Sequence, residues 1–332
     1  MKLSEKLYSF AMILGATASC ISLILVKIGI QSEWVFAVKD LPIYLMAALI
    51  PAEWLSSRKT LIMLIITGVF GVLLYGNYLL LNSDYLSPTP NIRQFLGPLL
   101  ILLVFCSLKI DQEAFNRLTN LLCFLTVFIF TFGFLEQITE FWSLIDLSDY
   151  FRLKGIPTDK NGLSYMFYEP AFGNRERMTS TFIDPISLGH FLASCGIYIF
   201  YFENKSKMEI TALVLSIIGM GLALSKGAIL QFIIGVLILN PRIPLLFKLV
   251  AAGLGALSIL ALPQKEGILL HIKGFTNSIN SLELFGHGIG AAGNYTAMFS
   301  SNPLASSELN INDTFIGSML GQIGLVGTIA WI

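Results

Sequence analysis

The sequence predicts an all-α fold: a polytopic helical membrane protein with about ten transmembrane helices and two long extracytoplasmic loops. Composition is the first reason. Hydrophobic residues make up 55% of the 332-residue chain, charged residues make up 13%, and mean hydropathy is +0.74. A soluble domain carries about twice that share of charged residues. The apolar runs are also long and frequent, and a helix satisfies its own backbone hydrogen bonds in lipid.

The apolar segments predict ten spans, at residues 7–26, 35–55, 61–81, 95–108, 118–138, 178–202, 210–224, 228–239, 245–262 and 312–332. The first continues to Ile30, which is too long for the apolar core of a secretion signal, so an uncleaved first span is expected. The spans at 95–108 and 228–239 are short for a hydrocarbon core of about 30 Å. We interpret 1–332 as a single integral membrane domain. Its apolar end at Trp331-Ile332 favours a C-terminally truncated fragment.

The basic residues predict the orientation. With a cytoplasmic N-terminus, ten of the 21 Lys and Arg residues fall in inner segments and four in short outer links, and the other seven lie in the two long loops. Basic residues favour the cytoplasmic side, so this split supports both the orientation and the spans. The long loops, residues 139–177 and 263–311, are then extracytoplasmic.

Several other site classes are disfavoured. The four cysteines lie inside apolar segments and are interpreted as small core residues. No His, Asp or Cys cluster has metal-ligand spacing, so no metal or cofactor is expected, and a net charge of zero gives nucleic-acid binding no support. Residues 288–293 match GxGxxG, but no strand precedes them. We expect these glycines to let the loop pack closely against helices, and we expect the glycines of the last span to allow close helix contact.

Four isolated cations lie at the outer ends of apolar segments and predict an anion site. Bidentate Arg and the point charge of Lys both suit phosphate, so a diphosphate is the natural ligand. The alternative is that these side chains are interface anchors whose charged ends reach into water. Asp184, near the start of the sixth span, is expected to pair with Arg177 or Lys226 or to act in catalysis. The candidate diphosphate-binding residues are Arg93, Arg175, Arg177 and Lys226.

Four motifs in order along the chain resemble the O-antigen ligase and polymerase superfamily. They are the run from Arg177 to Gly189, the turn Leu224-Ser225-Lys226-Gly227-Ala228, the glycine-rich segment from Leu284 to Gly290, and the run from Asn312 to Gly327. The resemblance covers the chain from about Arg93 onward. The superfamily's usual Ser-Arg-Gly turn is Ser-Lys-Gly here. Ligases typically carry a His where this chain has Asn312-Asp313-Thr314, so the departure favours a polymerase. The polymerase Arg-x10-Gly signature is missed by one position, at Gly189.

The resemblance implies a metal-independent glycosyltransferase in the bacterial inner membrane that joins undecaprenyl-diphosphate-linked oligosaccharide repeats of an O-antigen, capsule or exopolysaccharide. An acceptor hydroxyl attacks the anomeric carbon and undecaprenyl diphosphate leaves, so fixed cations would stabilise the leaving group. Asp313 and His287 are the candidate catalytic bases. Partners would be the lipid-linked glycan, the bilayer and other polysaccharide assembly proteins, with no nucleic acid.

Two further functions stay open. One is an O-antigen ligase that transfers glycan to lipid A core. The other, from a different class, is a lipid-linked-oligosaccharide flippase or other transporter. Transporters place charged sites near the midplane, often between internal repeats, whereas these cations gather at one face and no repeat is visible.

Overall fold

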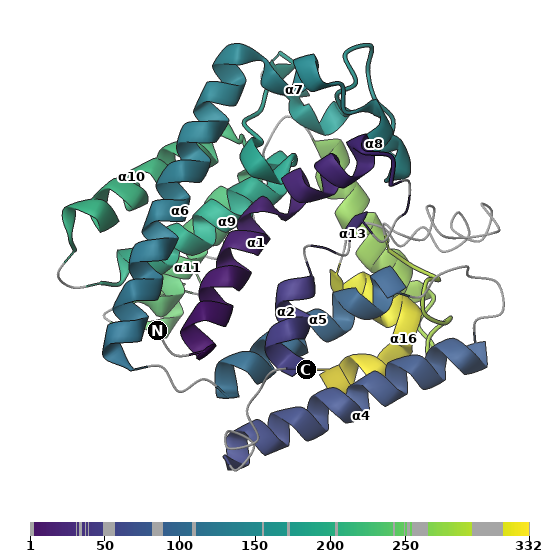
Figure 1. Cartoon of the computed structure of the whole chain (residues 1–332). Coiled ribbons are helices and arrows are strands. Elements are labelled where there is room, and N and C mark those ends of the chain that lie inside the picture. The colour runs from purple at the N-terminus through teal and green to yellow at the C-terminus, as the bar shows by residue number, and fades with distance from the viewer. Residues whose placement is uncertain are drawn as a thin grey trace. The chain divides into compact units, whose positions relative to one another are not determined.

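The computed structural model shows a mostly helical chain that divides into two compact units (Figure 1). Unit 1 comprises Met1–Pro42 and Ile110–Ala261, and unit 2 comprises Ile43–Lys109 and Leu262–Ile332. The structure describes residues 3–30, 32, 35–36, 38, 40–48, 57–81, 89–107, 111–154, 156–170, 173–202, 205–241, 243–248, 250, 253, 265–293 and 315–331. The predicted span 245–262 and the loop residues 294–311 lie largely or wholly outside these ranges.

Three helices in the described part are long and apolar enough to cross a membrane: α1 (Leu3–Lys27, the apolar window beginning at Glu5), α4 (Arg58–Leu81) and α6 (Gln112–Thr139). Shorter apolar stretches occur at Gln94–Val104, Pro185–Phe200, Lys226–Leu239 and Phe315–Trp331. The helical membrane class is thus supported, and the number of ten spans stays a prediction.

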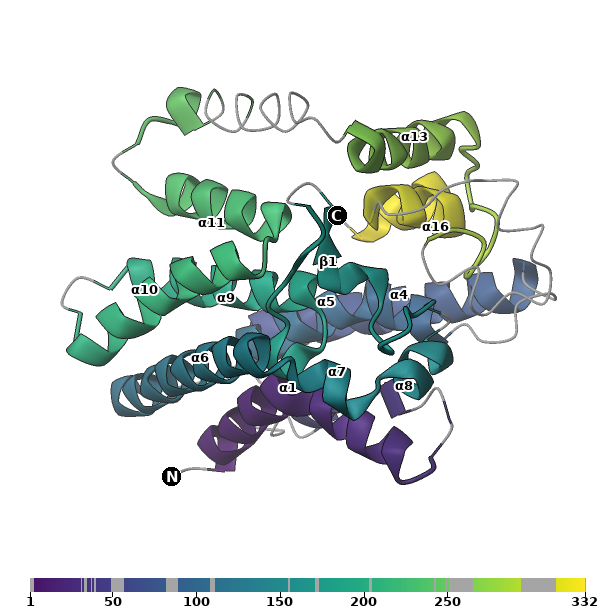
Figure 2. The ribbon, with the colours of Figure 1, turned by 90° about the horizontal axis from the view of Figure 1, so that it is seen from above.

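Unit 1 is built on α1, α6, α9 (Pro185–Phe200), α10 (Lys207–Leu222) and α11 (Lys226–Leu239). The helix α9 packs against both α10 and α11, and α6 packs against α10 (Figures 1 and 2). Side chains at the helix starts satisfy free backbone N–H groups: Asp111 accepts from Ala114 N, and Ser206 and Glu209 form a capping box on α10. The core between these helices includes Leu125, Ile129, Leu188, Leu192 and Met220.

The predicted sixth span at 178–202 is wrong at its start. Residues Ser180–Phe182 form a short 3-10 turn, η4, and the helix α9 begins only at Pro185. Asp184 caps α9, Pro185 occupies the first turn, and Ile183 has a left-handed φ of 52°, so the helix cannot extend backwards. At 16 residues, α9 is about 24 Å long.

The first long loop is folded. It contains α7 (Phe141–Ile145), α8 (Ser148–Leu153), the turn η2 (Tyr165–Phe167) and a hairpin of β1 (Tyr168–Glu169) and β2 (Arg175–Glu176). Its aromatic side chains form a second core with the end of α1, in which the Phe151 ring meets the Phe167 ring edge-on at 5.8 Å. The loop is therefore a packed cap over one end of unit 1.

Unit 2 contains α4, α5 (Thr89–Ser107), α13 (Lys265–Asn280) and α16 (Phe315–Trp331), and α2 (Leu41–Ala48) spans the sequence boundary between the units. Three cysteines whose side chains the structure describes, Cys20, Cys123 and Cys195, are free, and the last two are buried, as predicted for core residues. The core of unit 2 joins α4, α5 and α16 through Phe70, Phe95 and Met319.

The helix α16 is broken at Gly324, whose φ of 67° and ψ of −168° are not helical. A segment before it in the sequence, residues 283–293, lies in the break. The N–H groups of His287 and Gly288 donate to the carbonyls of Gly321 and Gln322, and Leu325 N and Val326 N donate to residues 283 and 284. Gln322 adds a side-chain bridge, accepting from Gly290 N and donating to the Ala292 carbonyl. The predicted close packing of the glycine loop is confirmed, and its partner is this break.

Gly286 and Gly324 interlock at the break. A Cβ on Gly286 would lie 2.5 Å from both Gln322 O and Gly324 N, and one on Gly324 would lie 2.3 Å from Gly286 N. Both residues have positive φ, so an L side chain is disfavoured twice over, by conformation and by collision with backbone. The sequence expectation of close helix contact for Gly324 is therefore corrected, since its contact is with a loop.

We predict that Gly286→Ala and Gly324→Ala each destabilise unit 2 by about 2–4 kcal/mol, since no flexible side chain can move to relieve the clash. The control is Gly68→Ala on α4, where a Cβ meets nothing within 4 Å. Thermal unfolding of the detergent-solubilised protein measures the effect. Equal melting temperatures for the three variants would contradict the interlock.

Candidate functional site

The best-defined polar site in unit 1 lies where α6 and α10 end and α9 and α11 begin. The segment from Arg177 to Asp184 crosses this end without α-helical structure and contains only the short 3-10 turn η4. Glu136, on the last turns of α6 and 2% exposed, accepts from the backbone N–H groups of Thr179 and Ser180 at 3.3 and 2.9 Å and from the Thr179 hydroxyl. The carboxylate thus accepts the hydrogen bonds that backbone carbonyls would accept if this segment were an α-helix.

Two hydroxyls fix the same segment against the neighbouring helices. Ser180 Oγ donates to the Ile129 carbonyl of α6, and Thr181 Oγ1 donates to the Ala16 carbonyl of α1, both at 2.6 Å. Ser180, Ile183 and Leu224 all have left-handed φ angles of 47–52°. This conformation is unfavourable for residues other than glycine, most of all for β-branched Ile. Such strain concentrates at functional sites, and here it marks the two segments that carry the predicted cations.

Arg177 is buried, with 8% of the residue exposed. Its Nε donates to the Ala223 carbonyl at 2.9 Å, and its terminal nitrogens face the carbonyls of Met166 and Leu224 at 3.4 Å. Burial lowers the pKa of this guanidinium, while the charges of Glu169 and Asp184 act to raise it. Arg177 therefore joins η2 of the loop to the turn that precedes α11.

Lys226 is the first residue of α11 and lies on the surface, with 44% of its side chain exposed. Its Nζ lies 3.1 Å from the carboxylate of Glu169, whose side chain is only 10% exposed. Glu169 also lies opposite Arg175 in the β1–β2 register, and Arg175 is exposed. Lys226 thus pairs with the Glu169 carboxylate, Arg177 is within range of its charge, and Arg175 lies opposite Glu169 in the hairpin.

Asp184 has a local role. Its carboxylate accepts from the N–H groups of Ile186 and Ser187 and from the Ser187 hydroxyl, at 2.5–3.2 Å. In the described part of the chain it forms no direct ion pair, and it acts on Arg177 through its field. The expected pairing with a cation is therefore replaced by capping of α9.

The other predicted site residues belong to unit 2. Arg93 lies in α5, but its side chain is outside the described part, as is all of Asp313. His287 hydrogen-bonds through Nε2 to the Ser281 carbonyl at 2.8 Å, and its Nδ1 lies 3.7 Å from Glu283 Oε1. With Nε2 donating to a carbonyl, Nδ1 is the nitrogen that remains to exchange a proton.

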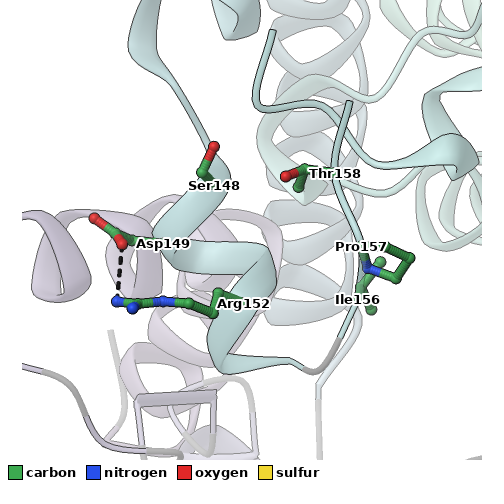
Figure 3. Close-up of a pocket in the computed structure, with 6 residues that line it drawn as sticks. All are labelled: Ser148, Asp149, Arg152, Ile156, Pro157 and Thr158. Atoms are coloured by element: carbon green, nitrogen blue, oxygen red, sulfur yellow. Dashed lines mark hydrogen bonds and ion pairs between the residues drawn. The ribbon is translucent and has the colours of Figure 1, made fainter. Parts of the chain in front are cut away.

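A pocket of about 530 Å³ opens on the first loop (Figure 3). It is lined by Ser148, Asp149, Arg152, Ile156, Pro157 and Thr158. Arg152 donates to Asp149 at 2.9 Å within α8, and Figure 3 shows this ion pair across from the segment 156–158. The Ser148 hydroxyl donates to Asp146, so the polar groups of this pocket are partly paired within the protein.

Sequence reasoning missed Glu136, Glu169 and His190. For Glu136 and His190 a signal was present, because each is an ionisable residue within an apolar span. Glu169 gave no such signal, since its loop is polar and only the hairpin brings it to Lys226.

Comparison with known proteins leaves the chain without a match: no family model, no curated protein and no solved structure matches it. Among the described residues, no three His, Cys, Asp or Glu side chains converge as metal ligands. Metal independence stays a prediction.

We predict that Glu136→Leu lowers stability by about 2–4 kcal/mol because it leaves two buried N–H groups unpaired. Glu136→Gln should cost less than half of that, since one amide oxygen can still accept from both N–H groups while its NH2 faces the Thr179 hydroxyl. Thermal unfolding in detergent measures both variants.

The matched control is Glu113→Leu on the same helix. The Glu113 side chain is 83% exposed and pairs with Arg117 at the surface, an interaction worth about 0–1 kcal/mol. A Glu136→Leu protein as stable as Glu113→Leu would show that the carboxylate does not hold the segment.

Proposed function

We propose that the protein is a polysaccharide polymerase that joins undecaprenyl-diphosphate-linked oligosaccharide repeats at the outer face of a bacterial inner membrane. The observation that carries the proposal is that Lys226 pairs with Glu169 at one end of the unit 1 helices, with Arg177 in range of the same carboxylate and Arg175 opposite it in the hairpin. Such a cluster suits a diphosphate leaving group. The resemblance of the motifs supplies the glycan chemistry.

The arrangement of unit 1 supports the proposed orientation. The cation cluster and the folded loop share one end of the helices, whereas Arg117, Lys205 and Lys207 lie toward the starts of α6 and α10 at the other. Short basic segments favour the cytoplasm, so the cluster would face outward. The proposal keeps the ten spans and the cytoplasmic N-terminus.

The cations have different roles in the proposal. Lys226 and Arg175 are exposed and would contact the diphosphate directly. Arg177 donates to backbone carbonyls and would hold the Ala223-Leu224 turn, and thereby Lys226, in position. Glu169 balances the Lys226 charge in the resting protein, and an arriving diphosphate would displace it.

The broken helix α16 favours a second candidate, a lipid-linked-oligosaccharide flippase. Transporters bind ligands at the ends of interrupted helices, where backbone groups are free. Here the groups of Gly321, Gln322, Leu325 and Val326 at the break are hydrogen-bonded to the 283–288 segment. The described break therefore has fewer free backbone groups for a ligand than a transporter site would have. We therefore prefer the polymerase.

We predict that Lys226→Ala lowers polymerisation by about a hundred- to thousandfold with an unchanged melting temperature, because a fixed donor to the leaving group is lost. Lys226→Arg should retain more activity, since the charge survives. Arg177→Ala should lose both activity and stability, because buried carbonyls lose their donor. The assay uses the purified protein with lipid-linked repeat units, and glycan bands are resolved on gels.

Lys160→Ala is the control, since Lys160 is an exposed loop cation with no described role in the cluster. If Lys226→Ala gave the wild-type pattern of glycan bands at equal protein level, the cations would be interface anchors and not a diphosphate site. Deletion of the protein distinguishes the alternatives: single-repeat product indicates a lost polymerase, and accumulated lipid-linked polymer indicates a lost ligase.

We predict that Lys160→Cys reacts with an impermeant thiol reagent in intact cells and that Lys207→Cys reacts only in inverted vesicles. Both positions are exposed, and they lie at opposite ends of unit 1. The native cysteines are replaced by alanine beforehand. The reverse labelling pattern would place the cation cluster in the cytoplasm and exclude an outward-facing polymerase.

A further inference from the structure

The helices α9 and α11 approach closely because glycines line their contact. A Cβ on Gly189 would lie 2.5 Å from the Ser225 side chain, and one on Gly235 would lie 2.4 Å from Ile197. This close approach lets short polar side chains of the two helices reach each other.

On this helix pair, His190, Ser194 and Gln231 form a closed chain of hydrogen bonds. His190 Nδ1 lies 2.5 Å from Gln231 Oε1, Gln231 Nε2 donates to Ser194 Oγ at 3.0 Å, and Ser194 Oγ donates to the His190 carbonyl at 2.9 Å. The Gln231 oxygen can only accept, so Nδ1 carries the proton. In this tautomer the lone pair of the ring is on Nε2.

The Nε2 edge of His190 faces the start of α11. A Cβ on Gly227 would lie 3.6 Å from both Cε1 and Nε2 of the ring, and Gly227 directly follows Lys226. His190 is exposed and is five residues beyond the first residue of α9, or about 8 Å along the helix. The base and the proposed diphosphate site thus belong to the same unit and the same ends of two packed helices.

The hydrogen bonds join α9 to α11, but a structural contact needs neither an ionisable ring nor an exposed position. Beyond Lys226, Gln231 is the one polar side chain of α11, and the exposed imidazole fills no core. Ionisable and amide side chains are costly in apolar spans and are typically functional there. An imidazole with its tautomer fixed and Nε2 open is the arrangement that a general base requires.

We propose that His190 is the proton acceptor of the transfer reaction, an inference that rests on the proposed function. The hydroxyl oxygen of the acceptor sugar bonds to the anomeric carbon of the donor, and its proton passes to Nε2. The bond between that carbon and the diphosphate oxygen breaks, and its electron pair leaves with undecaprenyl diphosphate beside Lys226. The imidazolium then releases its proton to water. Gln231 is a positioning residue that holds the tautomer.

The test is His190→Ala in the purified polymerisation assay. We expect kcat to fall by about a hundred- to ten-thousandfold with KM little changed, and added imidazole to restore part of the rate. Gln231→Leu should lower kcat, whereas Gln231→Glu, which keeps an acceptor for Nδ1–H, should retain most of it. Thr131→Val, which removes an exposed hydroxyl bonded only to its own helix, is the control.

Wild-type kcat for His190→Ala overturns the inference, and the proposed function stands if Lys226→Ala still fails. A loss without imidazole rescue that accompanies a changed oligomeric state also overturns it, because the polar chain is then a contact between copies. If the wild-type protein itself makes no polymer from lipid-linked repeats, the proposed function fails.

Discussion

The buried carboxylate of Glu136 is the constraint on which unit 1 depends. A chain segment can cross an apolar helix bundle without helical structure only if another group accepts from its N–H groups. Glu136 does this for Thr179 and Ser180, and the hydroxyls of Ser180 and Thr181 return hydrogen bonds to α6 and α1. Because this segment is fixed, Arg177 reaches the turn before α11 and Asp184 starts α9.

The composition and the apolar pattern predict the helical membrane class, and most described helices fall near their expected ranges. The start of the sixth span is the instructive error. Residues 178–184 are apolar enough to be predicted as helix, but Asp184, Pro185 and the left-handed φ of Ile183 make α9 begin only at Pro185. Tertiary hydrogen bonds offset the cost of this strained conformation. The cations could be singled out from the sequence because they lie at or near the ends of apolar segments. The burial of Arg177 was not predictable, since exposure depends on how the loop folds back.

The cluster shows why charge alone is a poor guide to a residue's role. Arg177 and Lys226 look equivalent in the sequence, yet one is 8% exposed and bound to carbonyls, and the other lies at the surface beside Glu169. A rigid guanidinium with several donors suits the joining of backbone segments, and a flexible ammonium suits exchange between a carboxylate and a ligand. In the proposed mechanism Lys226 stabilises the charge of the leaving group and His190, on the helix packed against α11, accepts the proton.

The interlock of Gly286 with Gly324 has a consequence for biogenesis. Unit 2 is assembled from two stretches of chain that flank most of unit 1, so it can be completed only after α16 has been synthesised. Until then the amides of His287 and Gly288 lack their α16 partners, a state that water tolerates and lipid penalises. The segment therefore acquires these hydrogen bonds only after α16 has been made, late in synthesis of the chain.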